Sequence, residues 1–157
     1  MNSFLRSIGL QPIEFSSAIH GTIKKLKAGG NPFIGDILDV TFDRVKALIV
    51  LFSPDDEVQL RKHLWSKGEK KDEKKLLPQA RPNVIFEAGL AFGRHQEKTL
   101  FISVGEIKPF SDIAGRHMLN LTNTSASRRD FAGRLRNMGC SIDLSGNDWE
   151  NEVDSTA

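Results

Sequence analysis

The most regular feature of this sequence is a pair of short apolar runs with amphipathic stretches between them. Residues 47–52 (ALIVLF) and 99–104 (TLFISV) are apolar at almost every position. A strand with this pattern is buried on both faces, which is typical of a parallel sheet lying between helices. The pattern predicts a strand at each run. Shorter strands are predicted at residues 12–15, 117–121 and 141–144.

Apolar residues recur at helical spacing between the predicted strands. Helices are predicted at residues 2–8, 31–45, 82–95 and 127–138. Pro32 and Pro82 stand where proline is favoured, at the first helical position, while Gly9 and Gly139 follow helix ends as C-caps. Strands and helices therefore alternate along the chain. This order predicts an α/β fold with a mostly parallel sheet between helix layers.

Two segments lack any apolar period. Residues 66–80 are rich in charge and are predicted to form a long loop, and residues 147–157 are polar and acidic and are predicted to form a disordered tail. The chain has 157 residues, which suits one domain with a real core. We therefore expect a single domain over residues 1–146.

Composition excludes several classes of protein. The net charge is +2, with 39% hydrophobic and 27% charged residues, so electrostatics gives no case for specific nucleic-acid binding. Cys140 is the only cysteine, which excludes an intrachain disulfide and favours a small core residue at the start of a strand. No apolar run approaches the ~18 residues of a membrane span. The N-terminus does not resemble a signal peptide, so a cytoplasmic location is expected.

The strongest candidate for chemistry is Glu87. It is the only acidic residue in residues 81–95 (RPNVIFEAGLAFGRH), where its neighbours Phe86, Ala88, Leu90 and Ala91 are expected to be buried. A buried carboxylate loses solvation and must find a partner or shift its pKa. Glycines and alanines in this run would let the helix approach a sheet or a ligand closely. The segment therefore predicts a working carboxylate on a helix.

The residues that begin this helix allow two interpretations each. Arg81 could pair with a pyrophosphate or take part in a structural ion pair that holds Glu87, and the structural role is favoured. Asn83 could contact a ligand, although a helix N-cap is the favoured role.

Acidic residues also follow the predicted strands, where open α/β sheets bind their ligands. Asp55 and Asp56 follow the first apolar run, and a helix cap is the favoured role for Asp56. Asp112 and Gly115 follow the second run and could rim the same pocket or form a turn. No third ligand accompanies the paired acids, and no two histidines have metal-ligand spacing, so no metal is expected.

Four ordered segments resemble the bacterial TIR-like predicted nucleotide-binding proteins. The match covers about residues 4–149, and the segments that carry it are residues 4–13 (FLRSIGLQPI), 52–56 (FSPDD), 81–89 (RPNVIFEAG) and 109–115 (PFSDIAG). The resemblance implies a flavodoxin-like TIR fold and cleavage of NAD at the nicotinamide–ribose bond, with NAD as substrate and no separate cofactor. Glu87 matches the catalytic position. The predicted substrate-binding residues are Arg81, Asn83, Ser53, Asp55 and Asp112.

The resemblance also implies a role as an effector of bacterial defence that works through self-association or with a sensor partner. A loop at Gly21 and Lys24 to Lys27 is the candidate assembly surface. The sequence departs from the family at the N-terminus, where the family's first strand has no counterpart and a partner could supply it. Two alternatives remain: a nucleoside deoxyribosyltransferase-like enzyme, which also uses a helix-borne Glu, and a non-catalytic nucleotide-binding or interaction module.

Overall fold

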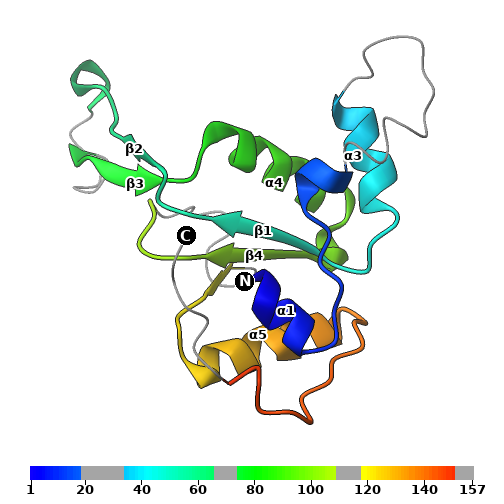
Figure 1. Ribbon diagram of the computed structural model, residues 1–157. Coiled ribbons are helices and arrows are strands. Elements are labelled where there is room, and N and C mark those ends of the chain that lie inside the picture. Colours follow the sequence, from blue (N-terminus) through cyan, green and yellow to red (C-terminus); the bar gives the residue numbers. More distant parts are fainter. Residues whose placement is uncertain (19–33, 66–73, 109–117, 151–157) are drawn as a thin grey trace. The chain divides into compact units, whose positions relative to one another are not determined.

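The computed structural model describes residues 1–18, 34–65, 74–108 and 118–150. The described chain contains both helices and strands (Figure 1), but they do not alternate one for one as the sequence pattern predicts, because three strands follow one another between the helices at residues 34–42 and 82–94. The helices are α1 (Asn2–Ser7), α3 (Ile34–Phe42), α4 (Pro82–Arg94) and α5 (Ser125–Asn137), with 3-10 turns η1 (Lys62–Leu64) and η3 (Gln96–Lys98). The strands are β1 (Leu48–Phe52), β2 (Asp56–Val58), β3 (Leu77–Gln79), β4 (Thr99–Ser103) and β5 (Met118–Asn120).

The main sheet has three strands in the order β1-β4-β5. β4 and β5 are parallel, with Ser103 opposite Asn120, and the arrows of β1 and β4 point the same way in Figure 1. These strands confirm the α/β class and the predicted strands at residues 47–52, 99–104 and 117–121. Every residue of β4 is buried, as predicted, but β1 is only half-buried before Phe52. The difference arises because β4 is the middle strand and β1 lies at an edge of the described sheet.

The predicted loop at residues 66–80 contains a strand. β3 pairs antiparallel with β2, so that Asp56 lies opposite Gln79 and Val58 lies opposite Leu77. The pattern concealed this hairpin because β2 begins with two acidic residues and β3 contains Pro78, all of which are rare in strands. Residues 66–73 lie outside the described residues.

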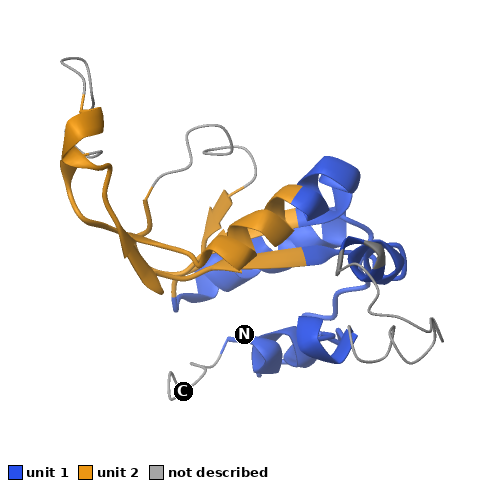
Figure 2. Ribbon diagram, turned by 90° about the horizontal axis from the view of Figure 1, so that it is seen from above, with its two compact units in different colours: residues 1–48, 90–99, 123–157 blue, residues 49–89, 100–122 orange. Residues whose placement is uncertain are grey.

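The chain divides into two compact units, coloured separately in Figure 2: residues 1–48, 90–99 and 123–157 form unit 1, and residues 49–89 and 100–122 form unit 2. The core of unit 2 centres on Phe52 and Phe101, whose rings lie edge to face with centroids 5.5 Å apart. Ile102 and Leu119 are buried with them. Unit 2 also contains the first half of α4 and therefore Glu87.

Helices dominate unit 1. Phe4 of α1 stacks on Phe131 of α5 with ring centroids 5.6 Å apart. The side chain of Thr124 caps α5 by accepting a hydrogen bond from the Ser127 amide at 3.2 Å. Gly9 and Gly139 have φ values of +84° and +85° just beyond α1 and α5. These positive values confirm the predicted C-caps, because glycine adopts this backbone conformation without steric cost.

Two short predicted strands are absent from these described segments. Residues 12–14 are irregular and Phe15 is already helical, while residues 141–144 form no strand. In the second segment the Asp143 carboxylate accepts hydrogen bonds from the Ser145 amide (2.9 Å) and hydroxyl (2.6 Å). Such local side-chain bonds stabilise a turn at the expense of a strand. Cys140 therefore precedes a turn, and burial raises the pKa of its thiol, which disfavours the reactive thiolate.

The expected tail begins later than predicted. Trp149 is only 5% exposed, and the guanidinium of Arg128 donates to the backbone carbonyls of Trp149 (3.5 Å) and Glu150 (2.6 Å) and to the side chain of Asn123. Residues 147–150 are thus part of unit 1, since an indole ring provides enough apolar area to hold a short polar segment in place. Residues 151–157 lie outside the described residues.

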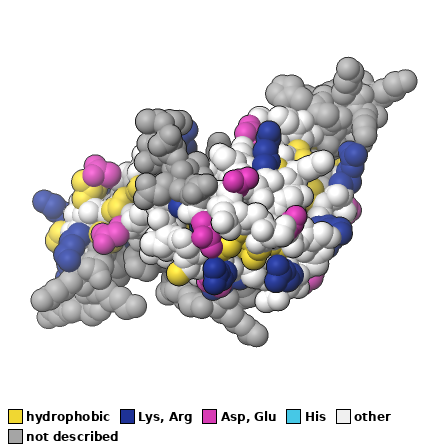
Figure 3. All heavy atoms as spheres, turned by 60° about the horizontal axis from the view of Figure 1, so that its bottom comes forward, with side chains coloured by type: hydrophobic (Ala, Val, Ile, Leu, Met, Phe, Trp, Pro, Cys, Tyr) yellow, Lys and Arg dark blue, Asp and Glu magenta, His cyan; other side chains and the backbone are white. Residues whose placement is uncertain are grey.

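The described surface carries both signs of charge. On the face in Figure 3, basic and acidic side chains are interspersed and do not gather into a patch of one sign. This distribution agrees with the low net charge. Over the described segments, the helices are all too short or too polar to cross a membrane.

Candidate functional site

Glu87 lies on α4 in a half-buried position. Burial raises the pKa of its carboxyl group above the ordinary value of 4.5, because desolvation disfavours the charged form. A position in the first turn of a helix would favour the ionised form, but α4 begins at Pro82 and its first turn holds no acidic residue. The helix dipole acts mainly within the first turn, so burial dominates at Glu87.

The neighbours of Glu87 divide between the two faces of α4. Ala88 and Ala91, three residues apart, are 5% and 1% exposed, whereas Phe86 is 56% exposed. Phe86 stands two positions before Ala88, which turns its side chain to the opposite side of the helix. The expectation that Phe86 is buried is therefore wrong. A Cβ atom at Gly89 would meet nothing within 4 Å, so among the described residues no close approach explains this glycine.

Three of the predicted substrate-binding residues do come together in unit 2. The hydroxyl of Ser53 donates to Oδ2 of Asp55 at 2.9 Å, and Nε of Arg81 lies 3.7 Å from the same oxygen. The turn after β1 is thereby joined to the residue that precedes α4. Arg81 forms the predicted structural ion pair, but with Asp55. The Arg81 side chain is 70% exposed, so solvent screens the pair and it adds little stability.

The other predicted residues are placed differently. Asn83 is an exposed residue inside α4, after Pro82, so it is not the helix N-cap. Asp56 begins β2 and caps no helix. Asp112 lies outside the described residues, as do Gly115 and the candidate assembly loop at residues 21–27.

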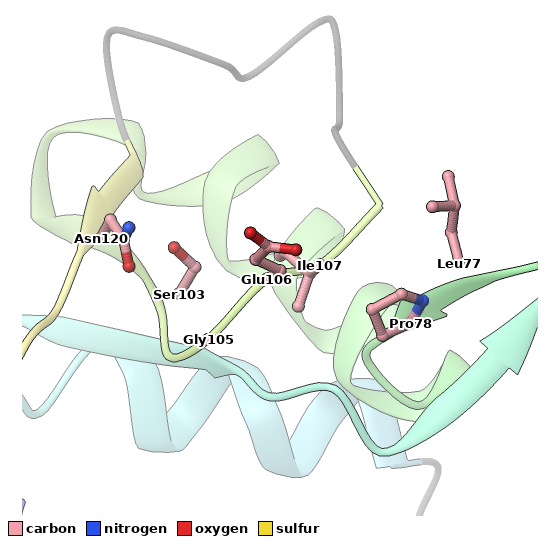
Figure 4. Close-up of a pocket in the computed structure, with 7 residues that line it drawn as sticks. All are labelled: Leu77, Pro78, Ser103, Gly105, Glu106, Ile107 and Asn120. Atoms are coloured by element: carbon pink, nitrogen blue, oxygen red, sulfur yellow. The ribbon is translucent and has the colours of Figure 1, made fainter. Parts of the chain in front are cut away.

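A cavity of about 320 Å³ opens in unit 2 where β4 and β5 end (Figure 4). Three of its lining residues have polar side chains: Ser103 and Asn120 lie on one side of the cavity, and Glu106 lies near its middle, beside Ile107. Open α/β sheets bind ligands at this edge. The described residues that line it are Leu77, Pro78, Ser103, Gly105, Glu106, Ile107 and Asn120. Glu87 does not line this cavity.

Backbone hydrogen bonds hold the walls of the cavity. The amide of Lys108 donates to the carbonyl of Pro78 at 2.6 Å, which ties the segment after β4 to β3. The amide of Leu121 donates to the carbonyl of Ser103 at 2.8 Å, which joins the ends of β4 and β5. Gly105 turns the chain between them with φ at +76°, in the left-handed region where a side chain would be strained.

Ser103, Glu106 and Asn120 were not predicted as site residues from the sequence. The signal was present, because Ser103 lies at the end of a predicted buried strand and Glu106 comes shortly after it, as Asp55 comes after the first one. Only the packing of the segment after β4 against β3 reveals that these residues share a cavity.

Metal chemistry finds no support in the described segments, which contain no group of three His, Cys, Asp or Glu residues able to hold an ion. The described histidines are His63, which is exposed, and His95. Nε2 of His95 lies 3.4 Å from Asp43, and its ring meets Phe42 edge to face. His95 therefore has a packing role.

Comparison with protein families settles the class of the chain. Residues 1–123 match the family model described as the TIR domain of the CAP12/Pycsar effector protein. The chain belongs to this bacterial TIR-domain family. The match includes all the candidate residues in α4, in the turns after β1 and β4, and in β5. A search of curated proteins and a search of solved structures each give no significant match.

Membership of the family confirms the TIR fold and supports a role as a defence effector. The family match ends at residue 123, before α5, whereas the resemblance in the sequence was expected to reach residue 149. The structure also bears on the departure noted at the N-terminus. In the described residues that precede β1, 1–18 and 34–47, the TIR domain has no strand.

The raised pKa of Glu87 has a consequence for the stability of the TIR domain. Because the folded state disfavours the charged carboxylate, stability is greatest below the unfolded pKa and falls as the pH rises through the folded value. We expect Glu87→Gln to raise the melting temperature slightly near neutral pH, and the gain to disappear below pH 4.5, where both side chains are neutral. Thermal melts from below pH 4.5 to neutral pH would measure this difference in melting temperature, with Glu97→Gln, which changes an exposed acid, as the control. A lower melting temperature for Glu87→Gln at neutral pH would contradict the expected desolvation.

Proposed function

We propose that this TIR domain cleaves the nicotinamide–ribose bond of NAD, and that the carboxylate of Glu87 acts on the ribose. The observation that carries the proposal is the environment of the Glu87 carboxyl group. It is a half-buried acid on a helix of a TIR domain, and it has no hydrogen bond or ion pair to any other described residue. A desolvated titratable group without a structural partner is a candidate for a functional site.

One carboxylate is enough for this reaction. Nicotinamide in NAD is a pyridinium and leaves as a neutral molecule, so no general acid has to protonate it. Ordinary glycosidases need a second carboxyl group for that purpose. Glu87 would stabilise the positive charge that develops at the anomeric carbon, or would orient the ribose hydroxyls. A partly desolvated anion does this more effectively than one in water.

Arg81 is suited to bind the pyrophosphate of NAD. Its guanidinium carries five N–H donors, and the contact with Asp55 uses only one side of it. The side chain is 70% exposed and lies at the N-terminus of α4, where anions are favoured. Ser53 orients Asp55 and so acts on Arg81 indirectly.

The proposed partner of this domain is a second copy of the chain or a sensor protein. The exposed Phe86 ring, next to Glu87 in the chain, is an apolar surface that a second copy or a sensor protein would cover. We therefore expect the specific activity to rise with protein concentration. Nicotinamide release per molecule, measured over a dilution series of the purified protein, tests this. A specific activity that stays constant across the series would contradict assembly at the site.

The primary test is release of nicotinamide from NAD by the purified chain at high concentration, followed by chromatography. Release above the uncatalysed background supports the proposal. No release, in a protein shown to be folded by its melting transition, would overturn it and favour a non-catalytic nucleotide-binding module.

A further inference from the structure

The cavity at the ends of β4 and β5 has an uneven lining. Ser103 and Asn120 lie on one side of it and Leu77 and Pro78 on the other, and Glu106 and Ile107 lie next to each other between them (Figure 4). Ser103 is 6% exposed, so its side chain is buried at the cavity. An apolar wall facing a few polar groups is the usual composition of a small-molecule site.

Among the described lining residues, the polar groups favour a ligand that donates hydrogen bonds and carries no negative charge. The carboxylate of Glu106 only accepts hydrogen bonds, and none of the described residues that line the cavity is basic. A phosphate group would therefore face a carboxylate without a neutralising cation. A vicinal diol, by contrast, can donate to Glu106, as a ribose 2′-hydroxyl does to an acidic residue in dinucleotide sites.

The volume of about 320 Å³ lies at the lower end for small-molecule sites and suits a ligand about the size of one nucleoside. The base would lie on the wall of Pro78 and Ile107. Glu87 must reach the nicotinamide ribose, yet it does not line this cavity. The cavity is thus suited to the other nucleoside of the substrate.

We propose that the cavity formed by Ser103, Glu106, Asn120 and the β3 wall binds the adenosine half of the dinucleotide, and that Glu106 selects NAD over NADP by accepting a hydrogen bond from the 2′-hydroxyl. This inference rests on the proposed cleavage of NAD, and it adds the residue that determines which dinucleotide is the substrate. A 2′-phosphate would meet the Glu106 carboxylate and be repelled.

Direct binding tests the cavity without any turnover. The probes are adenosine and adenosine 2′-monophosphate, with dissociation constants measured by calorimetry or by NMR titration. We expect the wild type to bind adenosine at least about tenfold more tightly than adenosine 2′-monophosphate. Glu106→Gln should remove most of this preference, because hydrogen bonds to charged groups account for effects of this size. The matched control is Glu57→Gln, which changes an exposed acid of β2 outside the cavity. Equal affinities in the wild type, or a preference unchanged by Glu106→Gln, would overturn the proposal.

Turnover provides a second arm. The ratio of kcat/KM for NAD to that for NADP should fall about tenfold in Glu106→Gln, through KM, and stay unchanged in Glu57→Gln. A ratio unaffected by Glu106→Gln would overturn the assignment of the cavity to the substrate. If neither dinucleotide releases nicotinamide, the cleavage proposal fails, and the adenosine probes still decide whether the cavity binds a nucleoside. Because Glu106 is exposed, the variant should fold, and its melting temperature checks this.

Discussion

Glu87→Ala should abolish nicotinamide release from NAD, with a loss of at least about 10²-fold, the size expected when one charged stabiliser of a transition state is removed. The fold should survive, because the substitution removes a desolvated charge and little packing. Glu87→Gln should lose activity to a similar extent, since it keeps the shape of the side chain but not its charge. Release of nicotinamide by the purified variants, at equal concentration and with matched melting transitions, measures the effect.

Two comparisons separate a role in the reaction from a role in the structure. Glu97→Gln changes an exposed acid that lies in the other unit, and it should retain wild-type activity. The wild type should also lose activity as the pH falls through the pKa of Glu87, and the midpoint should lie above 4.5 because burial raises that pKa. Turnover retained in Glu87→Ala, or a profile without this acidic limb, would count against the proposed mechanism.

Features with a long or strong pattern could be predicted from the sequence. The helix that carries Glu87 has a proline start and an apolar period over 13 residues, and β4 is apolar at almost every position. Both were found because each pattern is repeated within one element. The half-burial of Glu87 follows from the same pattern, whereas the exposure of Phe86 shows that an apolar residue on the wrong side of a helix stays in solvent.

Contacts between distant segments could not be predicted in the same way. The partner of Arg81 proved to be Asp55, because the turn after β1 comes close to the start of α4. The cavity depends on a bond from Lys108 to Pro78, which joins a segment after β4 to a strand that the charged sequence concealed. Side-chain chemistry indicated which residue types could act, but only the tertiary arrangement shows which of them share one space.

Trp149→Ala should destabilise the protein strongly, by about 3–5 kcal/mol, which is the usual cost of truncating a buried large aromatic residue. The indole is 5% exposed, and the guanidinium of Arg129 lies 5.4 Å from its ring centroid. Its backbone carbonyl and that of Glu150 accept hydrogen bonds from Arg128, so removal of the ring would also expose these bonds to water. Thermal and denaturant unfolding of the variant measure the loss.

Trp149→Phe is the informative control. It keeps most of the apolar ring and removes an indole N–H that is buried without a hydrogen-bond partner among the described residues. Because an unsatisfied buried donor is costly, this variant should lose much less stability than Trp149→Ala. Equal stability of Trp149→Ala and the wild type would mean that residues 147–150 contribute nothing to the fold, as first expected from their polar sequence. A large loss of stability in Trp149→Ala, but not in Trp149→Phe, would instead mean that Trp149 belongs to the folded part of the chain. The folded part would then extend past residue 123, where the family match ends.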